Sequence, residues 1–226
     1  MLINIQSLAE QLGKSPQKRV LPNGKEIEQI TWEGNDLKEI NHLLHNKTAE
    51  FPEHIKIDGA APAWLVAGLC HELHPCSCSI NTPQGYVPVG CKSPRGEGFG
   101  DNLQFNLKEA DGWTIVEAIQ KDSSTPLDLS KLTDMEPPEL PMGSKIILSG
   151  RMPNVAMCNL ANAYQHQSKA IGFYQPGTGA TIAITHDPSI ELGSCIPEKT
   201  VTSAEDKNIL NQICTTRPAT HPSFKK

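Results

Sequence analysis

The apolar positions of the chain fall into two stretches that follow the same pattern. Residues 55–57 and 146–148 are short apolar runs typical of buried strands, and each is followed by a glycine and a proline that suit a turn into a helix. Apolar residues then recur at helical spacing up to Leu73 and Tyr164, before a further strand, a glycine turn and a last strand. Each stretch therefore predicts a strand–helix–strand–strand unit with one right-handed crossover.

The two stretches align as an internal repeat. Gly59 and Gly150 are 91 positions apart, and the proline three positions after each glycine keeps this separation. The later turn glycines, Gly85 and Gly179, are 94 positions apart, so the second copy has gained three residues after its helix. Self-similarity of this kind predicts two copies of one structural unit.

The segments around the repeats predict further elements. Residues 26–32, 103–107 and 113–119 have the apolar pattern of strands, whereas the prolines of 135–142 exclude a regular helix or central strand, and 203–214 has the pattern of a short helix. We divide the chain into an N-terminal extension (1–20), a first module (21–92), a glycine-rich linker (93–101), a second module (102–200), and a C-terminal helix and tail (201–226).

Composition narrows the classes of function. The net charge is −5 and the mean hydropathy −0.36, and no apolar run approaches the length of a membrane span, so we expect neither a membrane protein nor a broad basic surface for duplex nucleic acid. A small local anion site stays compatible with this charge. The seven cysteines are odd in number and follow no disulfide rhythm, and the first residues lack a secretory pattern. We therefore expect a cytoplasmic protein with reduced thiols.

Both copies carry a longer motif. Residues 150–186 contain a glycine, an arginine, a proline, an apolar helix, a histidine after the helix, an apolar strand, a glycine turn, a second apolar strand and a closing histidine. Residues 58–89 follow much of this order and include Pro-Ala-Trp-Leu at 62–65. This motif resembles the small CRISPR-associated ring nuclease family that degrades cyclic tetra-adenylate. The resemblance implies an α+β fold with two tandem ferredoxin-like modules arranged as a pseudo-dimer.

The resemblance also implies a set of site residues, although neither copy is complete. The family's turn aspartate corresponds to Asn81 in the first copy and Gln175 in the second, and the closing histidine of the second copy corresponds to Lys92 in the first. An active site would therefore have to combine residues from both copies, or the catalytic activity of the family has been lost in this chain. The residues implied as catalytic are His186, His166 and His74, and those implied as ligand-binding are Arg151, Gly150, Gly59, His71, Asn81 and Gln175.

The chemistry of ring cleavage fits these residue types. The 2′-hydroxyl must be deprotonated while it attacks the neighbouring phosphorus, and histidine suits this step because its pKa lies near neutrality. Backbone N–H groups at the two helix starts would favour phosphate, although the glycines could equally serve only a tight turn. His71 and His74 lie near three cysteines, but without paired CxxC motifs we assign no metal ligand. Manganese is the one cofactor that the chemistry leaves open.

Two classes of function follow. The first is a CRISPR-associated ring-nuclease-like protein that binds a cyclic oligoadenylate, with cyclic tetra-adenylate as the expected ring, and cleaves it to switch off type III CRISPR signalling. The alternative is an inactive cyclic-oligonucleotide-binding module, or a structural subunit among CRISPR effector proteins. The partners would be the second messenger and effector proteins, with a homodimer of pseudo-dimers as a further expectation. Trp64 is expected in the core, with stacking on an adenine as the alternative.

Overall fold

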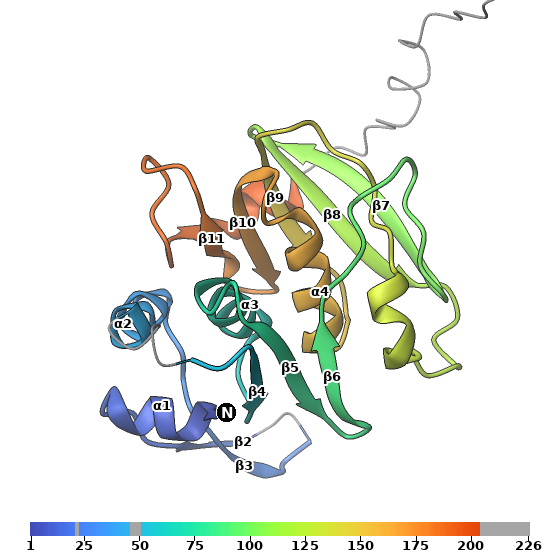
Figure 1. Cartoon of the computed structure of the whole chain (residues 1–226). Helices are drawn as coiled ribbons and strands as arrows, with labels where there is room; N and C mark the ends of the chain where they lie inside the picture. Colours follow the sequence, from blue (N-terminus) through green and yellow to red (C-terminus); the bar gives the residue numbers. More distant parts are fainter. Residues whose placement is uncertain (21–22, 46–50, 204–226) are drawn as a thin grey trace, which may run out of the picture.

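The computed structural model describes residues 1–20, 23–45 and 51–203. The described residues form a mixed α+β fold with two larger sheets and one separate hairpin (Figure 1). The first sheet has the order β1 (Leu2–Asn4), β4 (His54–Asp58), β5 (Ser77–Thr82) and β6 (Gly85–Val89). The second has the order β12 (Cys195–Ile196), β11 (Gly179–Thr185), β10 (Ser168–Gln175), β9 (Ser144–Ser149), β8 (Trp113–Gln120) and β7 (Leu103–Ala110).

Helices and the hairpin complete the architecture. The hairpin pairs β2 (Gln17–Val20) with β3 (Glu26–Gln29) in an antiparallel register. The helices are α1 (Ile5–Gln11), α2 (Gly34–His45), α3 (Ala63–Glu72), α4 (Asn154–Tyr164) and α5 (Glu198–Thr202), with a 3-10 helix, η2 (Leu129–Asp134). None of the described helices has the length and hydropathy needed to cross a membrane.

The two sheets contain the same arrangement of four strands. In the first sheet β1, β4 and β5 are parallel neighbours and β6 is antiparallel to β5. In the second sheet β8, β9 and β10 are parallel neighbours and β11 is antiparallel to β10. The crossover helices α3 and α4 connect the central parallel strands of their sheets. The two repeated sequence stretches therefore adopt the same strand order and directions.

The strand order differs from that of a ferredoxin-like module. In the split βαβ arrangement of that fold, a third strand lies between the two parallel strands that the helix connects. Here β4 is hydrogen-bonded directly to β5, and β9 directly to β10. The α+β class holds, but the ferredoxin-like expectation does not describe this sheet, because the crossover connects adjacent strands.

The turn glycines before α3 and α4 serve a close approach between strands. Gly59 and Gly150 have φ angles of +112° and +133°, a region that favours glycine. A Cβ atom at Gly59 would lie 2.9 Å from Cβ of Ile5, directly after β1. At Gly150 it would lie 2.2 Å from the carbonyl oxygen of Ala118 in β8. Since β1 and β8 hold the same place in their sheets, both units meet the same steric demand in the same way.

The core is shared between the two units. Helices α3 and α4 lie side by side in the centre, with strands of the first sheet on one side and strands of the second on the other (Figure 1). Helix α3 contacts β11 of the other unit, and α4 contacts β6 of the other unit. Trp64 is only 2% exposed, which confirms its expected place in the core, and its apolar neighbours extend without interruption into both sheets.

Three further segments predicted from the sequence can be compared with the structure. The proline-rich stretch 135–142 is irregular, as predicted, yet Met135 and Leu140 are buried in the core. The expected linker lies against this stretch, where Phe99 and Glu136 exchange backbone hydrogen bonds. The expected helix 203–214 lies, except for its first residue, outside the described residues. The division into modules stays a prediction.

Candidate functional site

The structure separates the sequence-predicted site residues into two groups. Because β4, β5 and α3 are linked by a parallel crossover, strand ends and helix starts meet at one edge of each unit. Gly59, Gly150, Arg151, Asn81 and Gln175 lie at this edge, which we call the helix-start face. The histidines 71, 74, 166 and 186 lie at the other ends of α3 and α4, which we call the histidine face. A helix of the length of α3 separates the two faces by about 15 Å.

The starts of α3 and α4 are paired at the helix-start face. The Nδ2 atom of Asn154 donates a hydrogen bond of 2.6 Å to the carbonyl oxygen of Ala61. The N-cap residues of the two helices are Pro62 and Pro153, and neither helix has a side-chain cap. The first backbone N–H groups of both helices are therefore left for solvent or for a ligand, and together with the helix dipoles they favour an anion.

Two cavities flank these helix starts in a crosswise arrangement. The Asn81 cavity, of about 400 Å³, combines the β5–β6 turn of the first unit with Pro153 and Asn154 at the start of α4. The Gln175 cavity, of about 620 Å³, combines Gln175 of the second unit with Gly59 to Pro62 before α3. In the repeat alignment Asn81 and Pro153 of the first cavity correspond to Gln175 and Pro62 of the second, whereas most other lining residues differ and Gly59 lines both cavities. Each therefore brings Asn81 or Gln175 of one unit together with the proline before the helix of the other unit.

The amides at the family's aspartate positions are held by hydrogen bonds. Asn81 donates through Nδ2 to Oδ1 of Asp58 at 2.8 Å, and Gln175 accepts through Oε1 from the indole Nε1 of Trp64 at 3.1 Å. An amide side chain cannot take up a proton as a carboxylate does, so neither residue supplies a general base. Arg151 is exposed and is not among the residues that line the two cavities.

The histidine face holds two edge-to-face pairs of rings. The ring centroids of His71 and His186 are 5.2 Å apart, and those of His74 and His166 are 5.3 Å apart. Each pair joins the first unit to the second. Burial lowers the pKa of His71 below its ordinary value, and the positive charge of the other three histidines lowers this pKa further, against a raising effect of its hydrogen bond to Gln165.

Gln165 links three of these histidines. Its carbonyl oxygen lies 2.7 Å from Nε2 of His186, so that nitrogen must carry the proton and donate. Its side-chain Oε1 lies 3.2 Å from Nδ1 of His71, and its Nε2 lies 3.3 Å from Nε2 of His166. Sequence reasoning missed Gln165. The signal was present, because Gln165 stands 91 positions after His74 and so holds the equivalent place in the repeat.

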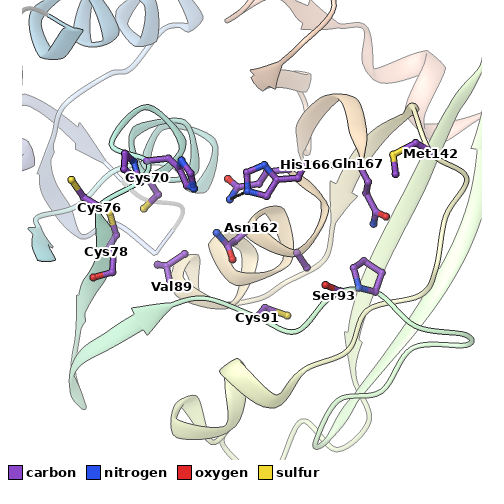
Figure 2. A pocket seen from close by; sticks show the side chains of 16 residues that line it. Cys70, Cys76, Cys78, Val89, Cys91, Ser93, Met142, Asn162, His166 and Gln167 are labelled. Atoms are coloured by element: carbon purple, nitrogen blue, oxygen red, sulfur yellow. Dashed lines mark hydrogen bonds between the residues drawn. The ribbon is translucent and has the colours of Figure 1, made fainter. Parts of the chain in front are cut away.

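A pocket of about 470 Å³ opens between the ends of α3 and α4 (Figure 2). His74 and His166 line it together with four cysteines, Cys70, Cys76, Cys78 and Cys91. None of the described residues that line it is a lysine, an arginine or a carboxylate. Helix C-termini carry partial negative charge, so this uncharged pocket offers little attraction to a phosphate.

Three cysteines of this pocket, Cys70, Cys78 and Cys91, have raised pKa values and are thiols rather than reactive thiolates. Burial and the charge of Glu136 raise the pKa of Cys91 to about 12. Hydrogen bonding to Cys70 and burial raise the pKa of Cys78, and hydrogen bonding to Cys158 is the main cause of a raised pKa at Cys70. Within the part of the chain that the structure describes, no three histidine, cysteine or carboxylate side chains are placed to hold a metal ion.

Comparison with known families adds one finding. Residues 120–197 match the family model of a CRISPR-associated protein, Cas_csx3. This supports a CRISPR association. The matched segment runs from the end of β8 to β12, and includes Gly150, Arg151, His166 and Gln175 as well as the closing histidine His186. No curated protein matches the chain.

Proposed function

We propose that this chain is a CRISPR-associated, ring-nuclease-like protein that binds a cyclic oligoadenylate, with cyclic tetra-adenylate as the first ring to test, at the helix-start face. The observation that carries the proposal is the crosswise construction of the Asn81 and Gln175 cavities. Two amide side chains at corresponding positions, beside two paired helix starts, suit a ligand that presents the same groups twice. A ring of four identical nucleotides has this property.

We also propose an evolutionary origin for the two units. We take the two units as copies of one ancestral unit, fused so that a single chain forms the pseudo-dimer. The equal strand order, the matched glycine turns and the contacts of α3 with β11 and of α4 with β6 support this. Pro153 and Asn154 complete the Asn81 cavity and Gln175 completes the Gln175 cavity, so an isolated first unit would lack one wall of each.

Binding without cleavage is the form of this function that the geometry favours. Asn81 and Gln175 replace the carboxylates of the family's turn, and the four histidines lie about 15 Å away at the far ends of the helices. A proton transfer needs direct hydrogen-bond reach or one bridging water. His186, His166 and His74 could therefore act on a phosphodiester at the histidine face but not on one at the helix-start face.

Cleavage at the histidine face is the second candidate. His74 and His166, of which Figure 2 labels the second, line the pocket between the ends of α3 and α4. A neutral and a protonated histidine could serve as base and acid for attack of the 2′-hydroxyl. This candidate offers less attraction to the phosphates, because the described residues of the pocket include no lysine or arginine. The two candidates place the ring at opposite ends of α3 and α4, and this separates them experimentally.

The test is calorimetric titration of the full chain with cyclic oligoadenylates of several ring sizes. Ala60 and Gln84 are exposed residues that line the Gln175 and Asn81 cavities respectively. We expect Ala60→Trp and Gln84→Trp to weaken binding by filling the cavities, while Asn106→Trp, at an exposed position of the edge strand β7, leaves binding unchanged. Failure of every ring to bind would refute the proposal and favour a structural role among effector proteins.

Product analysis decides between binding and cleavage. The chain is incubated with cyclic tetra-adenylate, with and without manganese, and the products are resolved. We expect an intact ring, and we expect His74→Ala, His166→Ala and His186→Ala to bind like the unmodified chain. Linear products that disappear in these variants would instead establish cleavage at the histidine face.

A further inference from the structure

The β2–β3 hairpin lies beside one of the two cavities. Ile27 and Gln29 of β3 line the Gln175 cavity. A second cavity of about 310 Å³ continues from it, and is lined by Lys18 and Arg19 of β2 as well as by Gln175. The two cavities share several walls, so together they form one groove between the hairpin and the start of α3. We call this the hairpin groove.

The base of the hairpin is fixed by a single lysine. The Nζ atom of Lys14, just before β2, lies 2.8 Å from Oδ2 of Asp36 and donates to the carbonyl oxygen of Thr31 at 3.2 Å. The same ammonium lies 6.0 Å from the ring centroid of Trp32. Lys14 therefore ties the segment before β2 to the segment after β3. Lys18 and Arg19 extend from an anchored base.

The Asn81 cavity differs in charge from the hairpin groove. Of the described residues that line the Asn81 cavity, none is charged, and part of its wall is Pro126, Leu127 and Leu129 from the segment between β8 and β9. The hairpin occupies the corresponding segment of the first unit, between β1 and β4. The two units have thus acquired different insertions at the same place. The hairpin adds cations at the rim of the Gln175 cavity, whereas the segment between β8 and β9 adds a neutral, apolar wall to the Asn81 cavity.

We propose that the β2–β3 hairpin is a cationic arm that holds a phosphodiester of the bound nucleotide over the hairpin groove, through Lys18 and Arg19. This rests on the proposed function, because it assumes an oligoadenylate at the helix-start face. The chain as a whole carries a charge of −5 and repels a polyanion. Local cations beside Gln175 offset that repulsion where the ligand binds. The arm also makes the two halves of the site unequal, so one phosphate of the ring is held more tightly than its symmetry mate.

Strand geometry makes the two basic residues distinguishable. Lys18 pairs with Glu28 across the hairpin and Arg19 pairs with Ile27. Successive side chains of a strand point to opposite faces, so one of the two faces the groove more directly than the other. The carboxylate of Glu28 also lines the Gln175 cavity, and opposes an anion there. Single variants therefore show which side chain carries the contact.

The experiment is titration of the full chain with cyclic tetra-adenylate at about 50 mM and about 300 mM salt, where the screening lengths differ about 2.5-fold. The variants are K18A, R19A and the double variant K18A/R19A. The matched control is R95A/K199A, which removes the same charge from an exposed arginine and an exposed lysine that lie outside the hairpin and line neither the Gln175 cavity nor its continuation. We expect the double arm variant to bind about tenfold more weakly at the lower salt, and the difference to shrink at the higher salt, as for any loss of phosphate contacts.

The outcomes separate the two proposals. Binding by the unmodified chain, with loss in K18A/R19A and none in the control, supports the arm. Equal affinity of the arm variant and the unmodified chain at both salt concentrations would overturn the arm and leave the proposed function standing. Equal losses in the arm and control variants would overturn it as well, since net charge alone would then account for the effect. No binding by the unmodified chain overturns both.

Discussion

Substituting Gly150 by alanine tests whether this glycine is required by the fold or by a ligand. A Cβ atom there would lie 2.2 Å from the carbonyl oxygen of Ala118, so β8 or the turn before α4 must move. An alanine in the left-handed region costs about 1–2 kcal/mol, and forced displacement of packed structure costs about 1–3 kcal/mol more. We therefore expect Gly150→Ala to lower the free energy of unfolding by about 2–5 kcal/mol, out of a typical total of about 5–15 kcal/mol.

The matched control is Gly177→Ala. Gly177 has a φ angle of +81°, but no atom lies within 4 Å of its added Cβ, so the backbone cost remains and the steric clash does not. We expect a loss of about 1–2 kcal/mol for this variant. The assay is urea unfolding followed by circular dichroism, with the midpoint of thermal unfolding as a second measure, where 1 kcal/mol corresponds to about 2–4 °C at this chain length. Equal losses in the two variants would refute the steric explanation.

Two further predictions concern pH and a buried hydroxyl. The pKa of His71 is lowered in the folded chain from an ordinary value of 6.5, so the unfolded chain binds a proton more readily, and the free energy of unfolding should fall as the pH drops below about 6.5. His71→Gln should flatten this dependence in urea titrations at several pH values, and an unchanged slope would contradict the assignment. Tyr164→Phe removes a hydrogen bond of 2.6 Å to the carbonyl oxygen of Pro138 and leaves that oxygen unpaired, so urea unfolding should show a loss of about 1–3 kcal/mol. No loss in this variant would mean that water satisfies the carbonyl.

The repeated units could be predicted from the sequence because their signals are local. An apolar run, a glycine and a proline define β4 and the start of α3, and the same signals define β9 and the start of α4. The strand β1 has three residues and owes its conformation to pairing with β4, so local pattern gives no sign of it. Helix α2 was missed although Leu37, Ile40 and Leu44 have helical spacing and are buried.

The candidate site could be predicted in its parts but not in its arrangement. Sequence reasoning found the turn positions Asn81 and Gln175 and the histidines, because each stands at the end of an element. The predicted crossover already implies that the first group and the second lie at opposite ends of the helices, because the glycines precede each helix and the histidines follow it, but this consequence was not drawn. The crosswise cavities were also beyond reach, because residues 59–62 and Gln175 meet only through the packing of one unit on the other.

The side-by-side packing of α3 and α4 within one chain has a consequence for dilution. Two separate subunits would dissociate as their concentration falls, and a composite pocket between them would be lost with the interface. Here the helices remain neighbours at any concentration, because the same backbone carries both. A substitution on one side also has no mirror image on the other, so each pocket could be tuned independently.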